Sequence, residues 1–187
     1  MNNAGFPLVG FGEDLLLEEY RKQLETNFFG NVAMTKAMLP VMREQKSGHI
    51  IQVTSVAGRA GQPMLSAYSA FKFALEGFSE SLRIETHSLG IRVAIVEPGA
   101  FDTDIWARNL YGKKAQHPSS PNRERSRRLA DFVKNSARSR RDAREVARLI
   151  VSIAKNLHPR LRYIVGVMAG CNSGCAVSRP GKPTSAS

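Results

Sequence analysis

The chain has 187 residues, of which 42% are hydrophobic and 23% charged, and its formal net charge at pH 7 is +11. This length is that of one domain with its own core, and the composition is that of a globular protein. No apolar run approaches the roughly 20 residues of a membrane span and no signal peptide is recognised, so a cytoplasmic protein is expected. Cys171 and Cys175 have no matching Cys or His set, so neither a disulfide framework nor a zinc site is indicated, and no metal is expected.

Most of the positive charge lies between Arg108 and Arg148, where the chain has 13 Lys or Arg residues and 4 acidic residues. A basic region of this kind can bind nucleic acid, an acidic substrate or an anionic membrane surface, or it can simply be solvated. Only two aromatic residues, Tyr111 and Phe132, are scattered among its charges, and it has no recognisable nucleic-acid module. The pattern therefore favours a solvated, Arg-rich lid and helix, and neither nucleic acid nor a membrane is expected as a partner.

The first long element is a helix predicted over residues 13–44. Glu13 suits the positive N-terminal end of a helix, a bend is expected near Gly30, and Pro40 marks the last turns or a kink. One face of this helix is apolar, with residues spaced as in a buried stripe: Leu17, Tyr20, Leu24, Phe28 and Val32. Asn27 lies in the middle of the helix and by itself is an ordinary polar residue.

A short apolar run at residues 49–55 predicts a buried parallel strand. Ser55 falls at its C-terminal end, which is the edge where open α/β sheets bind their ligands. His49 lies at the start of the strand, far from that edge, and is not expected to be catalytic. After a loop, apolar residues recur at helical spacing and predict a helix over residues 66–89, which Gly90 ends.

Tyr68 and Lys72 are four residues apart, so their side chains leave the same face of the predicted helix. A phenol beside a fixed ammonium can donate and accept a proton. A free tyrosine has a pKa of about 10, and lowering it to near neutral takes roughly 4 kcal/mol. An exposed lysine does not supply that energy, whereas a shielded site that also holds a cationic ring does. The pair alone is equally typical of a helix with a tyrosine at its edge and a solvated lysine, so its meaning depends on the surrounding residues.

The second half of the chain predicts two further strands, over residues 91–96 and 162–166. A sharp turn at Pro98-Gly99 follows the first of them. Between the strands, a helix is predicted over residues 142–156 with its first residue as the N-cap. Residues 167–187 are rich in Ser, Pro and Gly and have no periodicity, so they are expected to be disordered.

Five separate motifs are spread from residue 2 to residue 103. They are Asn2-Asn3-Ala4-Gly5, Asn27, Ser55, Tyr68-Ser69-Ala70-Phe71-Lys72 and Pro98-Gly99-Ala100-Phe101-Asp102-Thr103. In order and rough spacing they resemble the short-chain dehydrogenase/reductase family, and the likeness runs to about residue 166. The resemblance implies an α/β fold with a Rossmann-like, doubly wound parallel sheet.

The resemblance also implies a role for each motif. In the family the tyrosine is the general acid/base, the lysine lowers its pKa and binds the nicotinamide ribose, and the serine holds the substrate oxygen. The asparagine supports a water-linked proton relay. The implied catalytic residues are Asn27, Ser55, Tyr68 and Lys72. The residues implied to bind NAD or NADP are Asn3, Ala4, Gly5, Tyr68, Lys72, Pro98, Gly99 and Thr103, the last through the nicotinamide carboxamide.

No glycine-rich turn opens a helix anywhere in this sequence, although a dinucleotide fold normally begins with a strand, such a turn and a helix. The chain is therefore expected to be an N-terminally truncated domain over residues 1–166, roughly two βαβ units short. The family places its substrate lid at residues 104–141. The choice between NAD and NADP is not readable, because the residues that determine it lie in the absent part.

Two functions from different classes follow. The first is an NAD(P)-dependent oxidoreductase that transfers a hydride between a nicotinamide cofactor and a ketone, aldehyde or alcohol. The alternative is a catalytically inactive chain that acts, if at all, by pairing with a full-length relative. In the family, the helices matching residues 13–44 and 66–89 pack against a partner subunit, so a homo-oligomer is expected. The complete set of motifs favours the enzyme.

Overall fold

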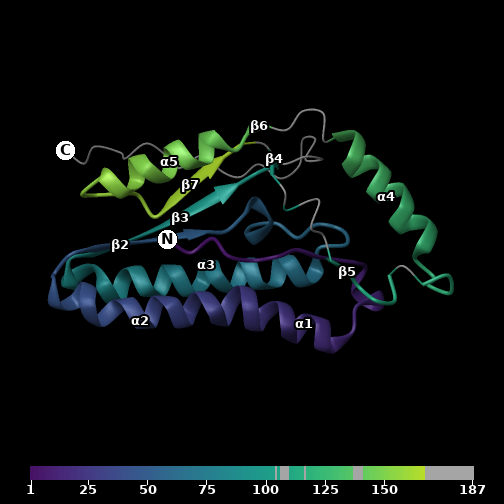
Figure 1. The fold of residues 1–187 in the computed structure, drawn as a ribbon, viewed down its shortest axis with the longest axis horizontal. Helices are drawn as coiled ribbons and strands as arrows, with labels where there is room; N and C mark the ends of the chain where they lie inside the picture. Colours follow the sequence, from purple (N-terminus) through teal and green to yellow (C-terminus); the bar gives the residue numbers. More distant parts are fainter. Residues whose placement is uncertain (104, 106–109, 116, 137–140, 167–187) are drawn as a thin grey trace, which may run out of the picture.

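The structure is a computed structural model that describes residues 1–103, 105, 110–115, 117–136 and 141–166, without side-chain detail at 110 and 132–136. A parallel sheet lies between two helical layers (Figure 1). One layer contains α1 (Leu17–Leu24), α2 (Gly30–Glu44) and α3 (Ser66–Thr86). The other is α5 (Arg144–Lys155). This arrangement confirms the predicted α/β class with a parallel sheet flanked by helices.

The sheet has the strand order β2-β3-β7, and all three strands are parallel. The strands are β2 (Gly48–Val53), β3 (Ile91–Pro98) and β7 (Arg162–Val165). Asn2 lies along the free side of β2: its backbone N–H donates to the Ile51 oxygen at 2.8 Å, and its oxygen accepts from Val53 at 2.9 Å. Residues 3–5 therefore run on past the edge where β2 ends.

The alternation of side chains along the strands creates a separate apolar core on each face of the sheet. Ile50, Ile91 and Val93 point towards α2 and α3, where they pack with Leu82. Their neighbours point the other way, where Ile51, Ala94 and Val96 pack with Ile153 of α5. Because both faces are covered, the strands read as continuous apolar runs, as predicted for a buried parallel sheet.

The first long helix differs from its prediction. Helix α1 begins at Leu17 rather than at residue 13, because Gly12–Asp14 forms a separate 3-10 turn. A π-helical segment, Glu25–Phe29, joins α1 to α2. Pro40 lies inside α2, which continues to Glu44.

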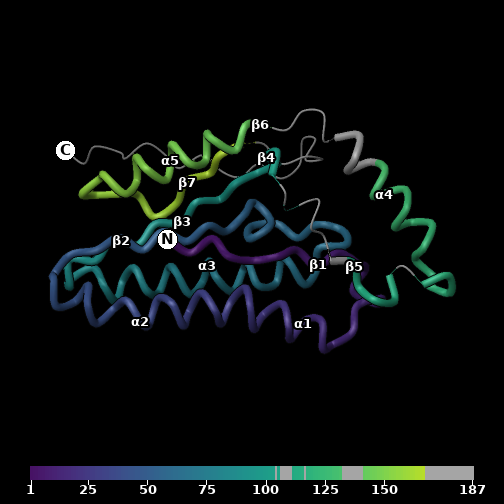
Figure 2. Tube along the Cα trace, viewed as in Figure 1, coloured from purple at the N-terminus to yellow at the C-terminus, as the bar shows by residue number. Residues whose placement is uncertain are grey.

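Two pairs of short parallel strands and helix α4 (Arg123–Ser136) lie outside the three-stranded sheet. Strand β1 (Leu8–Val9) pairs in parallel with β5 (Leu110–Tyr111), and β4 (Phe101–Asp102) with β6 (Arg141–Asp142). Helix α4 lies apart from the sheet, at the right of Figures 1 and 2. Its Leu129 packs against the cluster around Val9 and Met64.

The sequence predicted Asp142 as the N-cap residue of α5, but Ala143 occupies that position. Its carboxylate nevertheless accepts a hydrogen bond from the backbone of Arg144 at 2.8 Å, so it still satisfies one free N–H group of the first turn. Within the described residues, no helix has both the length and the apolar character needed to cross a membrane. The predicted tail, residues 167–187, lies outside the described residues, and the domain division at residue 166 stays a prediction.

Candidate active site

Ser55 lies two residues beyond Val53, the last residue of β2, and is the N-cap of a 3-10 turn, Val56–Gly58. Its backbone is extended, with φ of −174°, and its Oγ accepts a hydrogen bond from the Ala57 N–H at 3.1 Å. The same hydroxyl donates to the Pro98 carbonyl oxygen at 3.4 Å. Ser55 therefore lies at the C-terminal edge of the sheet, next to the turn that ends β3.

Tyr68 lies in the first turn of α3, with its phenol close enough to Ser55 for the serine hydroxyl to lower the tyrosine's pKa. The ring packs edge-on against Phe71, with 5.1 Å between the ring centroids. Lys72 follows one turn later, and its Nζ lies 5.5 Å from the centroid of the Tyr68 ring. The Lys72 ammonium also donates to the Val53 carbonyl oxygen at 2.9 Å. The structure thus brings the three predicted residues Ser55, Tyr68 and Lys72 together.

Burial dominates the electrostatics of this site. Removal from water raises the pKa of Tyr68 to about 12, although the Ser55 hydroxyl works in the opposite direction. Burial also lowers the pKa of Lys72 to about 7, against the attraction of the Glu76 carboxylate. The lowered pKa expected for Tyr68 is therefore not produced by the chain's own residues, because burial outweighs the other effects on the phenol and also weakens the positive charge of Lys72 near neutral pH.

This shift makes the stability of the chain depend on pH. The pKa of Lys72 is about 7 in the folded chain, below its ordinary value of 10.5, so the folded chain binds fewer protons than the unfolded chain between these pH values. The free energy of unfolding should therefore rise, by about 3 kcal/mol, as the pH increases from 7 to 10. Urea unfolding of Lys72→Met should show no such rise, whereas Lys36→Met, which changes an exposed residue of α2, should keep it.

Asn27 lies in the π-helical segment and is fully buried. Its side chain holds the backbone of Phe6: Nδ2 donates to the Phe6 oxygen at 2.7 Å, and the Phe6 N–H donates to Oδ1 at 3.2 Å. The side-chain amide of Asn31 donates to the Asn27 carbonyl oxygen. Single π-helical turns are frequent at functional sites. The visible task of the Asn27 side chain is to fix the segment after Gly5, and its part in a proton relay stays a prediction.

The residues predicted to contact a cofactor lie along the same edge of the sheet. Asn3, Ala4 and Gly5 are exposed where the chain runs past β2, and a Cβ on Gly5 would come within 3.3 Å of the Asn27 Oδ1. Gly99 is held by its N–H, which donates to the Val165 oxygen at 2.8 Å, and Thr103 is exposed. Two backbone segments, residues 3–5 and the turn after β3, therefore lie on either side of the end of β2, to which Lys72 is hydrogen-bonded.

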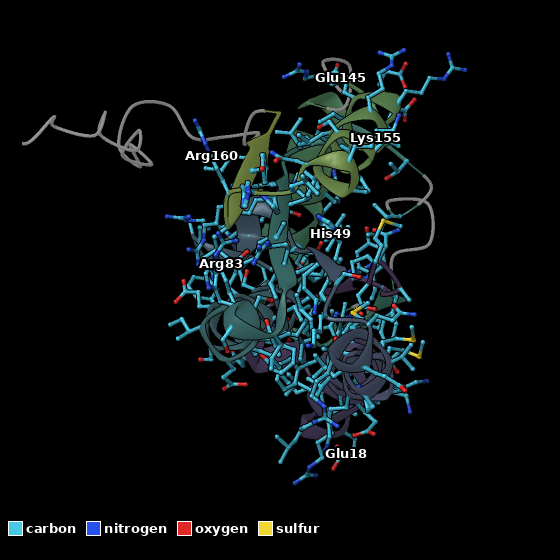
Figure 3. All side chains as sticks on the ribbon, turned by 90° about the vertical axis from the view of Figure 1, so that its left-hand side faces the viewer. Glu18, His49, Arg83, Glu145, Lys155 and Arg160 are labelled. Carbon is cyan, nitrogen blue, oxygen red and sulfur yellow. The ribbon has the colours of Figure 1, made fainter. Side chains whose placement is uncertain are left out.

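His49 lies at the opposite end of the sheet. Figure 3 views the molecule from the side where β2 begins, and His49 is labelled on this face together with Arg83 and Arg160. The imidazole Nε2 of His49 is 2.9 Å from the carbonyl oxygen of Asn156. This contact ties the start of β2 to the end of α5, and it leaves His49 away from Tyr68.

A buried charged network behind the site was missed by the sequence reasoning. Glu97 is fully buried at the end of β3, and its Oε1 lies 3.4 Å from Arg59 Nη1 and 3.1 Å from Arg162 Nε. Arg162 also pairs with Glu76 at 3.2 Å. Burial raises the pKa of both carboxyls, Glu76 and Glu97, against the pull of the arginines. The one sequence signal was the position of Glu76, one helical turn beyond Lys72.

Comparison with known proteins decides what these residues belong to. The sequence model of the family described as short chain dehydrogenase matches residues 1–113, which include the Asn27, Ser55, Tyr68 and Lys72 motifs. The chain belongs to the short chain dehydrogenase family. The match ends before α4, so the family's shared motifs precede the Arg-rich part of the chain.

Individual family members match over a longer stretch. The chain is 40% identical over 168 residues to the uncharacterized oxidoreductase YusZ of Bacillus subtilis (89% of this chain, 60% of that protein). It is 38% identical over 169 residues to the oxidoreductase BOA17 of Botryotinia fuckeliana, with the same two shares. A short-chain dehydrogenase structure from Streptomyces avermitilis superposes with a TM-score of 0.73 and 34% identity, over 88% of this chain and 59% of that one. The chain thus spans about 60% of the length of these three proteins.

Proposed function

We propose that this chain carries the catalytic half of an NAD(P)-dependent oxidoreductase acting on a ketone, an aldehyde or an alcohol. The supporting observation is the grouping of Ser55, Tyr68 and Lys72 at the C-terminal end of β2: the Lys72 Nζ lies 5.5 Å from the centroid of the Tyr68 ring and 2.9 Å from the Val53 oxygen, and the Ser55 hydroxyl is close enough to influence the Tyr68 pKa. Two hydroxyls that meet at the edge of a parallel sheet can hold one carbonyl oxygen between them. Its relatives named as oxidoreductases support the same reading.

The residues present fit the nicotinamide half of such a cofactor. The exposed residues Asn3, Ala4 and Gly5 follow the segment paired with one side of β2, and Pro98 and Gly99 end the strand paired with the other side; both are proposed to contact the cofactor. Among the described residues the buried Lys72 ammonium donates to one acceptor, the Val53 carbonyl, and an ammonium has three N–H donors to offer, so ribose hydroxyls are proposed as further acceptors. Thr103 is proposed to contact the carboxamide. The choice between NAD and NADP stays open.

The chain's own groups would carry the proton chemistry. A bound nicotinamide supplies or accepts the hydride. In the direction of reduction, Ser55 and Tyr68 donate hydrogen bonds to the substrate oxygen, and Tyr68 then gives its proton to that oxygen. The pKa of about 12 keeps Tyr68 in the protonated form that this step needs at neutral pH. Lys72 is placed to help return a proton to Tyr68, and Asn27 is proposed to support the relay.

A homo-oligomer formed through the helical layer is part of this proposal. Large apolar side chains are exposed on its helices: Phe29, Met34, Met38 and Val41 at α2, and Phe73 and Ile84 on α3. Exposed apolar side chains gathered on neighbouring helices are the kind of surface that a second protein chain covers, and a second copy of this chain is the proposed partner. A cytoplasmic location likewise stays a prediction.

Calorimetric titration of the 187-residue chain with NADH and with NADPH tests the proposal. Saturable binding of one or both is expected, and Lys72→Met should weaken it because the ammonium is the proposed ribose ligand. Lys36→Met serves as the control and should bind as the unchanged chain does. If neither dinucleotide binds, the chain is inactive by itself, and pairing with a full-length relative becomes the better account.

A further inference from the structure

The side chains of Lys72 and Glu76 are both hydrogen-bonded to the two residues directly before Ser55, at the end of β2. The Lys72 ammonium donates to the Val53 oxygen at 2.9 Å, and the next residue, Thr54, donates its hydroxyl to Glu76 Oε1 at 2.5 Å. Both helix residues are buried, with 9% and 5% of their surface exposed. Val53, the last residue of β2, and Thr54, which follows it, therefore bind consecutive turns of α3.

Glu76 is also held from the opposite side. Arg162 of β7 donates from Nε to Glu76 Oε2 at 3.2 Å. In the part of the chain that the structure describes, the charged or titratable groups around the Glu76 carboxylate come from four segments. They are Tyr68, Lys72 and Glu80 of α3, Glu97 of β3, Arg59 after the 3-10 turn and Arg162 of β7.

We propose that Glu76 is a positioning residue that keeps the Lys72 amine in its ammonium form, while Thr54 and Arg162 hold Glu76 as a carboxylate. A buried ammonium without a counter-charge tends to lose its proton. Glu76 provides that charge from one turn along the helix, where residues four apart are neighbours. The role rests on the proposed redox function, because Lys72 assists Tyr68 only while it is charged.

The electrostatics of the individual groups agree with this arrangement. Burial lowers the pKa of Lys72, and the negative charge of Glu76 opposes that effect. Burial raises the pKa of Glu76; the Thr54 hydrogen bond opposes this rise, the charge of Glu97 adds to it, and Arg162 again opposes it. Glu80 pairs with the same arginine but lies two turns from Lys72, so its charge is farther from the ammonium than that of Glu76.

The test is a pH titration of the Lys72 side chain in the cofactor-free chain, followed by NMR of ¹³Cε-labelled lysine and assigned with Lys72→Met. Glu76→Gln is expected to move the midpoint of Lys72 to lower pH by about one unit. Glu80→Gln is the matched control, since it removes another carboxylate from Arg162, and it should leave the midpoint in place. An unchanged midpoint in Glu76→Gln, or an equal shift in Glu80→Gln, would overturn the proposal.

A second variant covers the case in which Glu76→Gln does not fold. Thr54→Val removes one of the two groups that hold Glu76 ionised, so a smaller shift in the same direction is expected, and its absence would also refute the role. Because these measurements need no cofactor, they remain decisive even if the chain fails to bind NADH and NADPH. Where turnover is measured, Glu76→Gln should lose activity with rising pH earlier than Glu80→Gln does.

Discussion

Replacement of Tyr68 by phenylalanine is expected to lower the rate of carbonyl reduction about a thousandfold, within the range typical of general acid–base catalysis. The change removes the phenolic hydroxyl proposed as the proton donor and keeps the ring that packs on Phe71. The measurement is the oxidation of NADH or NADPH, followed by absorbance, with a panel of ketones and aldehydes.

Tyr20→Phe is the matched control for this experiment. Its hydroxyl lies 2.7 Å from the Ser66 Oγ, so it also contacts the start of α3, but it is not bonded to Ser55. The rate should change no more than about twofold, because no proton donor to the substrate is lost. Full turnover by Tyr68→Phe would remove the phenol from the chemistry and with it the proposed mechanism.

Replacement of Gly90 by alanine is expected to destabilise the chain by at least about 3 kcal/mol. Gly90 has a φ of +75°, and a Cβ at this position would come within 2.0 Å of the Lys46 carbonyl oxygen. The residue lies between the 3-10 turn His87–Leu89 and β3, so relief of the clash would displace the start of a central strand. Urea unfolding monitored by circular dichroism measures the loss.

Gly77→Ala, in the helix that precedes Gly90, is expected to have the opposite effect on stability. Gly77 lies inside α3, and a Cβ there would meet no atom within 4 Å. Alanine favours the helix over glycine by roughly 0.5–1 kcal/mol, so this variant should be stabilised. Equal effects of the two substitutions would show that the left-handed turn at Gly90 is not needed for folding.

Local sequence patterns were enough to predict several elements of this fold. The strands at 91–96 and 162–166 and the stop at Gly90 agree with the structure, since apolar runs and a left-handed glycine depend on neighbouring residues. The four-residue spacing of Tyr68 and Lys72 likewise placed both side chains on one helical face. These features are local, so sequence alone carries them.

Other features depend on contacts between residues far apart in the chain. Helix α1 starts later than predicted, and the 3-10 turn before it carries Asp14, which accepts a hydrogen bond from Ser120 at 2.9 Å. The Asn27 side chain is hydrogen-bonded to the backbone of Phe6, 21 positions away, and no local sequence pattern predicts that pairing. In each case a tertiary partner decided what the local signal left open.

The amino-acid sequence by itself determined the α/β class and the identity of the candidate site residues at the C-terminal edge of the sheet, because periodicity and motif spacing are properties of the linear sequence. The tertiary structure alone decided their ionisation. Tyr68 and Lys72 are shifted away from their ordinary pKa values by burial, and Glu76 is held by Arg162, 86 positions away. The free energy of a charge depends on the water and the charges around it, and only the folded chain sets both.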